Sequence, residues 1–239
     1  MRIFLAGATG AIGRRLVPLL LRAGHTVVGA TRSAAKAEEL KAAGVTPAVV
    51  DVFDSGALER AVVAARPEIV IHQLTDLPRI FDAAELAAAY PRNARIRTEG
   101  TRNLVAAAQA ASVRRFIVQS IAFGYAPGRE PHAESDPLNL ADGPRVVTVR
   151  GAADMEAQVL ASGIEAIVLR YGLFYGSGTW SERPGGKPPL HVDAAAHAAF
   201  LAVTCGRPGI YNIAEDDGTV SIECARRELN WDPAFRLDP

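Results

Sequence analysis

Cysteine, lysine and long apolar runs are all scarce in this chain of 239 residues. The two cysteines, Cys205 and Cys224, have no paired spacing and no histidines clustered beside them, so the sequence predicts neither a disulfide framework nor a metal site. Two thiols in a chain of this length favour a reducing compartment, and we predict a cytoplasmic location. No run of about 18 apolar residues occurs, which argues against a membrane span. The first apolar run is broken by glycine too early to be a secretion signal.

An excess of charge of one sign is also missing. Lysine and arginine total 26, aspartate and glutamate total 26, and the formal net charge is +0. No global field therefore attracts nucleic acid or an anionic membrane, and we predict neither partner. Hydrophobic residues make up 49% of the chain and charged residues 22%, an ordinary globular composition. Any anion must then bind at a local site.

Short apolar runs alternate with longer amphipathic runs through most of the chain. Fully apolar strands between helices are typical of a parallel sheet covered on both faces, and right-handed crossovers favour the doubly wound arrangement. The predicted strands span 3–6, 26–30, 47–50, 69–71, 115–119, 167–169 and 210–213. The predicted helices span 12–22, 34–43, 56–65, 93–111, 152–161, 193–204 and 222–229, with loops over 127–144 and 177–189, the second of them mobile.

These patterns predict an α/β fold, a Rossmann-like doubly wound parallel sheet with a small C-terminal substrate lobe. Residues 1–170 form the predicted dinucleotide-binding domain. Residues 171–239 form the predicted lobe, packed on that domain as part of one structural unit.

A glycine-rich turn joins the first predicted strand to the first predicted helix. A diphosphate needs close approach of the backbone and free amides at a helix N-terminus, and glycine permits both. Gly7 allows the tight turn, Gly10 leaves room for the phosphates, and Gly13 lets the helix lie close to the strand. The predicted diphosphate cradle comprises Gly7, Thr9, Gly10, Ala11, Ile12 and Gly13. The alternative is a glycine-rich turn without a ligand.

The end of the second predicted strand bears on which dinucleotide binds. NAD-preferring sites place an acidic residue there for the ribose 2′-hydroxyl. This chain has Thr31, Arg32 and Ser33 instead, with Lys36 one helical turn later. A guanidinium fork fits a 2′-phosphate and an ammonium adds charge beside it, so we predict NADP, with NAD as the alternative. Otherwise Arg32 and Lys36 are solvated surface charges.

Several short motifs, together with the glycine spacing, resemble the extended, atypical branch of the short-chain dehydrogenase/reductase superfamily. Within that branch, the sequence most resembles the proteins called the NAD-dependent epimerase/dehydratase family. It continues along almost the whole chain, through Asp51-Val52, Asn93 with Thr101 to Leu104, Leu169-Arg170-Tyr171, Tyr175-Gly176, His191 to Asp193, Gly209 to Asn212, and Leu229 to Pro233.

The resemblance implies cofactor contacts beyond the glycine turn. It places Asp51 and Val52 at the adenine, and Gln73 and Leu74 where the family keeps its small cofactor-lining residues. It places Tyr171, Gly172 and Leu173 near the nicotinamide. The same resemblance implies a homodimer formed through the helices at 93–111 and 152–161, whose alanine-rich faces equally suit packing on the internal sheet.

The predicted catalytic residues are Ser120 and Tyr171. Ser120 matches the catalytic Ser/Thr of the family, whose hydroxyl donates to a carbonyl oxygen and polarises it for hydride transfer; alternatively it caps local backbone. The usual acid, a Tyr followed by a Lys four residues on, is missing. Aligning Glu156 with the downstream Glu of the family puts Thr148 and Ala152 at those positions.

Substitute acids for the missing pair are Tyr171, Tyr175, Tyr125 or His132, although some reductions need no strong acid because solvent protonates the product. We therefore predict an NADP(H)-dependent oxidoreductase acting on a small carbonyl-type substrate. The alternatives are a non-catalytic NADP(H)-sensing regulatory protein and a sugar-nucleotide epimerase or dehydratase. Only residues 177–190 fill the place of a larger substrate lobe, which disfavours a sugar nucleotide.

Overall fold

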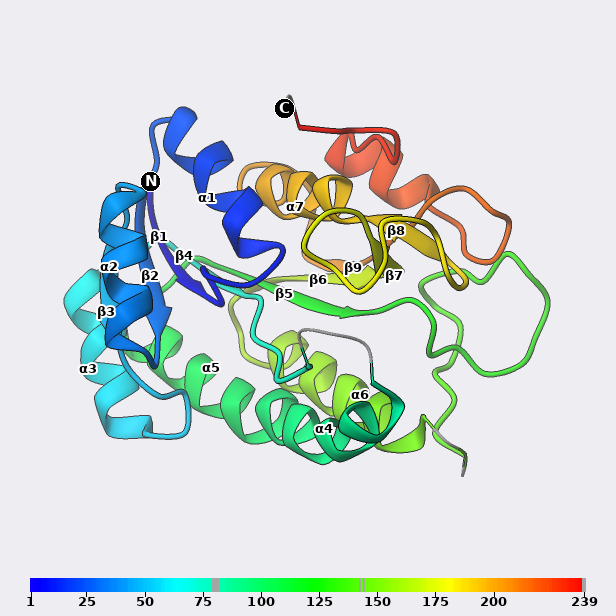
Figure 1. Cartoon of the computed structure of the whole chain (residues 1–239), viewed down its shortest axis with the longest axis horizontal. Helices are drawn as coiled ribbons and strands as arrows, with labels where there is room; N and C mark the ends of the chain where they lie inside the picture. Colours follow the sequence, from blue (N-terminus) through cyan, green and yellow to red (C-terminus); the bar gives the residue numbers. More distant parts are fainter. Residues whose placement is uncertain (79–81, 142, 144, 238–239) are drawn as a thin grey trace.

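One parallel sheet organises the molecule. The structure, a computed structural model, describes residues 1–78, 82–141, 143 and 145–237. Within these residues, seven parallel strands lie in the order β3-β2-β1-β4-β5-β6-β9 (Figure 1). Their bounds are β1 Arg2–Ala6, β2 Thr26–Thr31, β3 Thr46–Val49, β4 Ile69–His72, β5 Arg115–Ile121, β6 Glu165–Tyr171 and β9 Gly209–Ile213. The strand order reverses between β1 and β4, and such a switch point is where open α/β sheets bind ligands.

Helices cover both faces of this sheet (Figure 1). On one face lie α1 Gly13–Arg22, α2 Ala34–Ala42 and α7 Val192–Leu201. On the other lie α3 Ser55–Ala65, α5 Thr101–Ala110 and α6 Val146–Leu160, with α4 Ala83–Arg95 packed against α6. The predicted α/β Rossmann-like fold is confirmed.

Strand β1 shows why two layers of helices are needed. Alternate side chains of a strand point to opposite faces. Ile3 packs in the cluster that contains Leu16 of α1, whereas Phe4 packs with Leu104 of α5. All four of these side chains are 0% exposed. A strand that is apolar on both faces folds stably only when both are covered.

Two helices begin earlier than the sequence predicted. Helix α4 begins at Ala83 rather than Asn93, because the Asp82 carboxylate caps it by accepting from the Glu85 amide at 2.8 Å. A π-helical turn at Ile96–Gly100 (η1) then joins α4 to α5. Helix α6 begins at Val146 rather than Ala152. Its β-branched start has low helix propensity, and tertiary burial overrides that preference.

The last third of the chain also differs from the prediction in detail. Strands β7 Leu173–Tyr175 and β8 Pro189–His191 form a small parallel sheet that the sequence did not predict. The last predicted helix is a short π-helical turn, η2 Ala225–Leu229. Strand β9 pairs with β6, so residues beyond 170 complete the main sheet.

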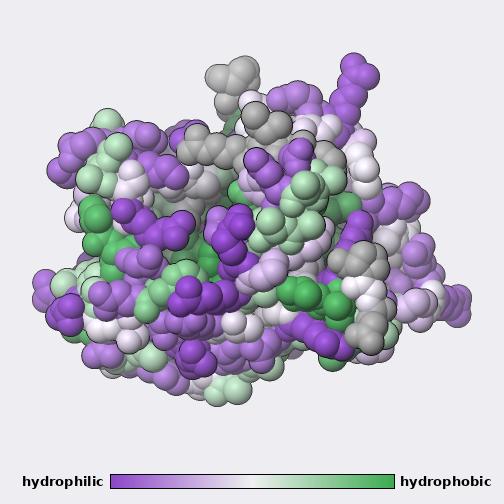
Figure 2. Space-filling model, turned by 60° about the horizontal axis from the view of Figure 1, so that its bottom comes forward, coloured by the Kyte–Doolittle hydropathy of each residue, from purple (hydrophilic) through white to green (hydrophobic). Residues whose placement is uncertain are grey.

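The outer surface over α4, α5 and α6 carries mostly hydrophilic side chains, with hydrophobic ones in separate patches (Figure 2). Among the described residues, no helix is both long enough and apolar enough to span a bilayer.

Candidate functional site

The turn after β1 brings the three glycines to the carboxyl edge of the sheet. Gly7 has a φ of +97°, and a Cβ there would lie 2.6 Å from the carbonyl oxygen of Gln73. A Cβ at Gly13 would lie 2.2 Å from the carbonyl oxygen of Gly7, so α1 starts in direct contact with the turn. Gly10 is exposed, and a Cβ there would meet Gly7 at 3.3 Å. Gly7 and Gly13 are required by the fold, whereas Gly10 leaves the space outside the turn open.

Within the described residues, no side chain caps the N-terminus of α1. Ile12 occupies the capping position and makes no side-chain hydrogen bond there, and the first turn carries no acidic residue. The first amides of a helix then point to solvent with the positive end of the helix dipole. Thr9 and Ala11 flank the exposed Gly10 in this turn. This cradle fits a diphosphate.

The carboxyl end of β2 carries two cations beside this cradle. Ser33 caps α2 by accepting from the Lys36 amide at 3.4 Å, and Thr31 accepts from the Ser33 amide at 3.2 Å. The Arg32 side chain is exposed and that of Lys36 is partly exposed. Within the part of the chain that the structure describes, neither cation has an ion pair or side-chain hydrogen bond. Both charges are therefore free to meet an anion.

Residues after β3 form the neighbouring wall. Asp51 accepts from the Phe53 amide at 3.0 Å, which shapes the turn. Val52 is 9% exposed, and its carbonyl accepts from the Asn103 side chain at 2.9 Å. Asp51 and Val52 thus lie at the same edge as the glycine turn. Their predicted adenine contact stays a prediction.

His72 and Gln73, at the end of β4, differ in how their side chains are hydrogen-bonded. The His72 Nδ1 accepts from the Leu74 amide at 3.2 Å, so its Nε2 donates to Thr101 at 3.1 Å. Burial lowers the pKa of His72 to about 4, which keeps it neutral near neutral pH. Gln73 is 6% exposed, and its buried Oε1 has no hydrogen-bond partner among the described residues. A buried acceptor that lacks a donor is a group that a ligand can satisfy.

Tyr171, one of the two predicted catalytic residues, lies at the end of β6. Its hydroxyl accepts from Gln73 at 3.4 Å and donates to the Ala195 carbonyl at 3.3 Å. Burial raises the pKa of this phenol, which weakens it as an acid. After it, Gly172 lies so close to Pro188 that a Cβ would be 2.6 Å from the carbonyl oxygen. The Tyr171 role stays a prediction.

Ser120, the other predicted catalytic residue, is part of a buried polar network. Its hydroxyl donates to Glu156 at 2.5 Å. The Arg170 guanidinium grips the same carboxylate with two bonds, of 2.9 Å and 2.7 Å. Arg170 also donates to the Tyr125 hydroxyl at 2.8 Å, which donates to Asn212 at 2.7 Å. Because the Ser120 proton points to Glu156, polarising a substrate carbonyl would require that bond to break.

The positions of the missing acid pair are filled in two ways. Ala152 is 0% exposed and packs with Ile121 and Val149 in a small apolar cluster. Arg97, from the π-helical turn, donates to the Thr148 carbonyl at 2.8 Å. Burial lowers the pKa of Arg97 to about 10, while Glu156 opposes the shift, so Arg97 stays charged at neutral pH. Neither Arg97 nor the Glu156–Arg170 pair was predicted as a site residue, although a lone charge within an apolar strand at Arg170 is the signal that marks the pair.

A pocket of about 250 Å³ lies between the end of β5 and the start of α6. Phe123 and Tyr125 line it from the segment after β5, and Arg145 and Val149 line it from the helix side. The Arg145 guanidinium lies 5.6 Å from the centre of the Phe123 ring. The pocket thus combines two aromatic side chains and an arginine in its lining.

A parallel sheet with an uncapped helix and a glycine turn at its switch point defines the Rossmann class of dinucleotide-binding proteins. Residues 7–184 match the model of a family described as NAD(P)H-binding. The chain belongs to this NAD(P)H-binding family, and the predicted nicotinamide cofactor is confirmed at that level.

Two curated relatives are reductases by name. A 3-diazoavenalumate denitrifying reductase from a Streptomyces species is 40% identical over 239 aligned residues, covering 91% of this chain and 77% of the relative. Quinone oxidoreductase 2 from Escherichia coli is 28% identical over 241 residues, covering 93% of this chain and 72% of the relative. The predicted NAD(P)-dependent oxidoreductase of the atypical, extended short-chain type is confirmed.

Solved structures share the fold. UDP-glucose 4-epimerase from Thermotoga maritima has a TM-score of 0.79 at 19% identity and covers 99% of this chain and 94% of its own. A short-chain dehydrogenase/reductase superfamily protein from Agrobacterium tumefaciens with bound NAD has a TM-score of 0.75 at 18% identity, covering 99% and 93%. At such identities the likeness describes the fold and not the substrate.

Proposed function

We propose that this protein is an NADP(H)-dependent reductase of small electrophiles that accept a hydride without a proton donor from the protein. The observation that carries the proposal is the filling of the acid positions. Thr148 and Ala152 stand there, beside Ile121, and none of the three can donate a proton usefully. A carbonyl reduction that needs a strong acid is poorly served by such a site.

The substitute acids suggested by the sequence are engaged elsewhere. Tyr125 donates to Asn212, and burial raises the pKa of its phenol. Tyr175 donates to Glu215. His132 stacks on Tyr125 with 5.0 Å between the ring centres, and its Nδ1 lies 3.1 Å from an Asp136 carboxylate oxygen. These bonds support a reaction in which no side chain gives up a proton.

The residues at the carboxyl edge supply binding and orientation. The α1 amides would hold the diphosphate, and Arg32 and Lys36 would bind the 2′-phosphate. The Gln73 Oε1, which has no partner within the described residues, would accept a hydrogen bond from the nicotinamide half. The nicotinamide supplies a hydride when it is bound. Asp51, Val52, Leu74, Gly172 and Leu173 complete the proposed cofactor contacts.

Aromatic diazo compounds and quinones are the substrate classes that fit this chemistry. Hydride transfer to a diazonium-bearing carbon forms a C–H bond while the C–N bond breaks, and the electron pair of that bond leaves with N2. The balance needs no proton. Hydride transfer to a quinone produces a hydroquinone anion, which takes its proton from water. The names of the two relatives support these classes, and the aromatic wall of the 250 Å³ pocket suits both.

The test is a set of turnover assays with NADPH and NADH. An arenediazonium salt and a benzoquinone should be reduced faster than in enzyme-free controls, whereas simple ketones should not. NADPH deuterated at C4 should deliver deuterium to the aryl carbon. Because no phenol titrates in the reaction, kcat should stay flat between about pH 6 and pH 9. Ketone reduction with an acidic or basic limb in its pH profile would overturn the proposal.

Tight NADPH binding without turnover of any panel member would favour the sensing alternative. A pull-down with and without NADPH would then look for a partner. The cytoplasmic location and the homodimer through α4, α5 and α6 both stay predictions. Sedimentation of the purified protein tests the dimer.

A further inference from the structure

Residues 176–181, here called the strap, connect the two walls of the switch-point crevice. At one end, the Ser177 carbonyl accepts from the Arg15 guanidinium of α1 at 2.5 Å. At the other end, the indole N–H of Trp180 donates to the Pro78 carbonyl at 2.7 Å. Pro78 follows β4, and β1, which leads into α1, is the neighbour of β4 in the sheet. The strap therefore crosses the edge at which the dinucleotide binds.

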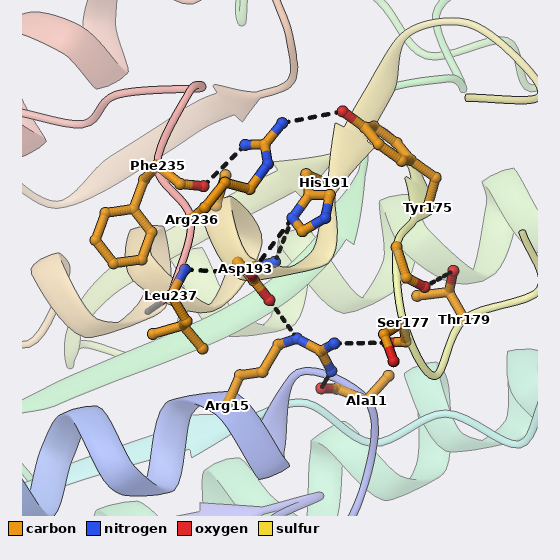
Figure 3. A network of polar contacts seen from close by, with 12 residues as sticks. Ala11, Arg15, Tyr175, Ser177, Thr179, His191, Asp193, Phe235, Arg236 and Leu237 are labelled. Atoms are coloured by element: carbon orange, nitrogen blue, oxygen red, sulfur yellow. Dashed lines mark hydrogen bonds and ion pairs between the residues drawn. The ribbon is translucent and has the colours of Figure 1, made fainter. Parts of the chain in front are cut away.

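Arg15 holds the strap to the glycine turn through one guanidinium (Figure 3). The same side chain donates to the Ala11 carbonyl at 3.1 Å and to Asp193 at 2.5 Å. Asp193 also accepts from the Leu237 amide at 3.2 Å, so the backbone at Leu237 contacts the Arg15–Asp193 ion pair. The Arg15 and Asp193 side chains are 17% and 13% exposed. A planar fork serves three acceptors at once, which a lysine ammonium on a flexible stem does less well.

Hydrogen bonds within the strap define a turn, and the predicted mobility of 177–189 stays a prediction. Gly176 has a φ of +106°, and a Cβ there would lie 2.6 Å from the His191 ring. The Thr179 hydroxyl donates to the Gly176 carbonyl at 2.7 Å, and the Gly176 amide donates to the Ser181 carbonyl at 2.8 Å. These bonds hold the turn closed between its two anchor points. The anchors differ in exposure, because the Trp180 side chain is exposed, whereas that of Arg15 is partly buried.

We propose that the strap retains the bound dinucleotide, with Arg15 and Trp180 as its positioning residues. This inference rests on the proposed function, since it needs a cofactor in the crevice. The dinucleotide enters and leaves when the more exposed Trp180 anchor opens, and Arg15 keeps the other end in place beside the Ala11 carbonyl. Neither residue takes part in hydride transfer, so loss of either anchor changes cofactor exchange more than the chemical step.

The experiment measures NADPH dissociation by stopped flow, with excess unlabelled NADP⁺ as the chase. Trp180→Phe keeps the ring and removes only the N–H donor. One hydrogen bond corresponds to about a tenfold change, so the dissociation rate should rise about tenfold. Trp180 is 39% exposed, whereas Trp231 is 2% exposed with its N–H on Ala194, so a change in tryptophan emission on binding reports the strap.

Arg15→Met tests the other anchor. Because hydrogen bonds from a charged group are lost, NADPH affinity should fall by about 10- to 100-fold, with partial rescue in Arg15→Lys. The matched control is Arg14→Met, the next residue of α1, whose side chain is 59% exposed and pairs with Glu39 at 3.5 Å. That control should change affinity by less than about twofold.

The outcomes separate the two proposals. If the wild-type protein binds neither NADPH nor NADH, the proposed function fails. If it binds NADPH and Trp180→Phe dissociates at the wild-type rate, the strap proposal fails alone. Should Arg15→Met not fold, the Trp180→Phe result decides, because that exposed ring can be replaced by phenylalanine without disturbing the core.

Discussion

The turn after β1 and the network at the ends of β5 and β6 lie at the same edge of the sheet, but they use polar groups differently. In the first region, the described part of the chain provides neither a side-chain cap for the α1 N-terminus nor a partner for the Gln73 Oε1. In the second, Ser120 and Arg170 both hydrogen-bond to the Glu156 carboxylate, and each of the three residues is 4% exposed. Unpaired groups indicate a place for a ligand, and a closed network indicates scaffold. The difference supports the proposal that this protein binds the cofactor at the first region and uses the second region as scaffold.

The largest effect is expected in the closed network. Glu156→Ala leaves the Arg170 guanidinium buried without its carboxylate, which should lower the free energy of unfolding by about 3–5 kcal/mol. Urea denaturation followed by circular dichroism measures this loss. Glu39→Ala, which removes an exposed partner of Arg14, should cost under about 1 kcal/mol. A similar small loss in both variants would show that the network is not structural.

The open region should respond in binding rather than in stability. Gly10→Val places a side chain where the diphosphate lies, and NADPH affinity should fall on the order of 100-fold. The melting temperature should fall modestly, because a Cβ at Gly10 would make a tight contact, 3.3 Å from the Gly7 carbonyl oxygen. Calorimetric titration measures the affinity. Gly185→Ala, a glycine with no atom within 4 Å of the added carbon, serves as the control. Unchanged affinity in Gly10→Val would show that the cofactor does not bind at the glycine turn.

A smaller effect distinguishes the two dinucleotides. Arg32→Ala should weaken NADPH binding about tenfold or more, because a charge-assisted hydrogen bond to phosphate is lost, and should leave NADH binding unchanged. Titration of both cofactors measures the ratio. Arg22→Ala, at the far end of α1, should leave both affinities as they are. A constant ratio in Arg32→Ala would remove the proposed contact with the 2′-phosphate.

The smallest effect is expected for Ser120→Ala. If the hydroxyl stays on Glu156 during turnover, kcat falls less than about threefold, and the unfolding free energy falls by about 1 kcal/mol for one hydrogen bond. Steady-state rates with the diazonium and quinone substrates measure the first quantity. A loss of kcat on the order of 100-fold would instead show that Ser120 turns toward the substrate, as the resemblance implies.

Local pattern was enough to predict the cofactor half. Strand β1 is apolar at every position from Ile3 to Ala6, and the glycines that follow it admit few alternatives, because Gly7 needs a positive φ and Gly13 needs contact with its own turn. The absence of an acid at Thr31 and of a Tyr-Lys pair at Thr148 and Ala152 can likewise be read directly from the residues. Such features depend on neighbours within one strand–turn–helix unit.

The partners of the charged side chains were decided only by the tertiary structure. Arg15 meets Ser177 and Asp193 across more than 160 positions, and Arg97 reaches Thr148 across 51. Nothing in the local sequence distinguishes Arg15 from its exposed neighbour Arg14. Long-range contacts depend on how the strands and helices pack, and packing sums many weak interactions that no short motif records. The sequence alone therefore predicted a cofactor fold without its usual acid, whereas the strap and the buried network became visible only once the chain was folded.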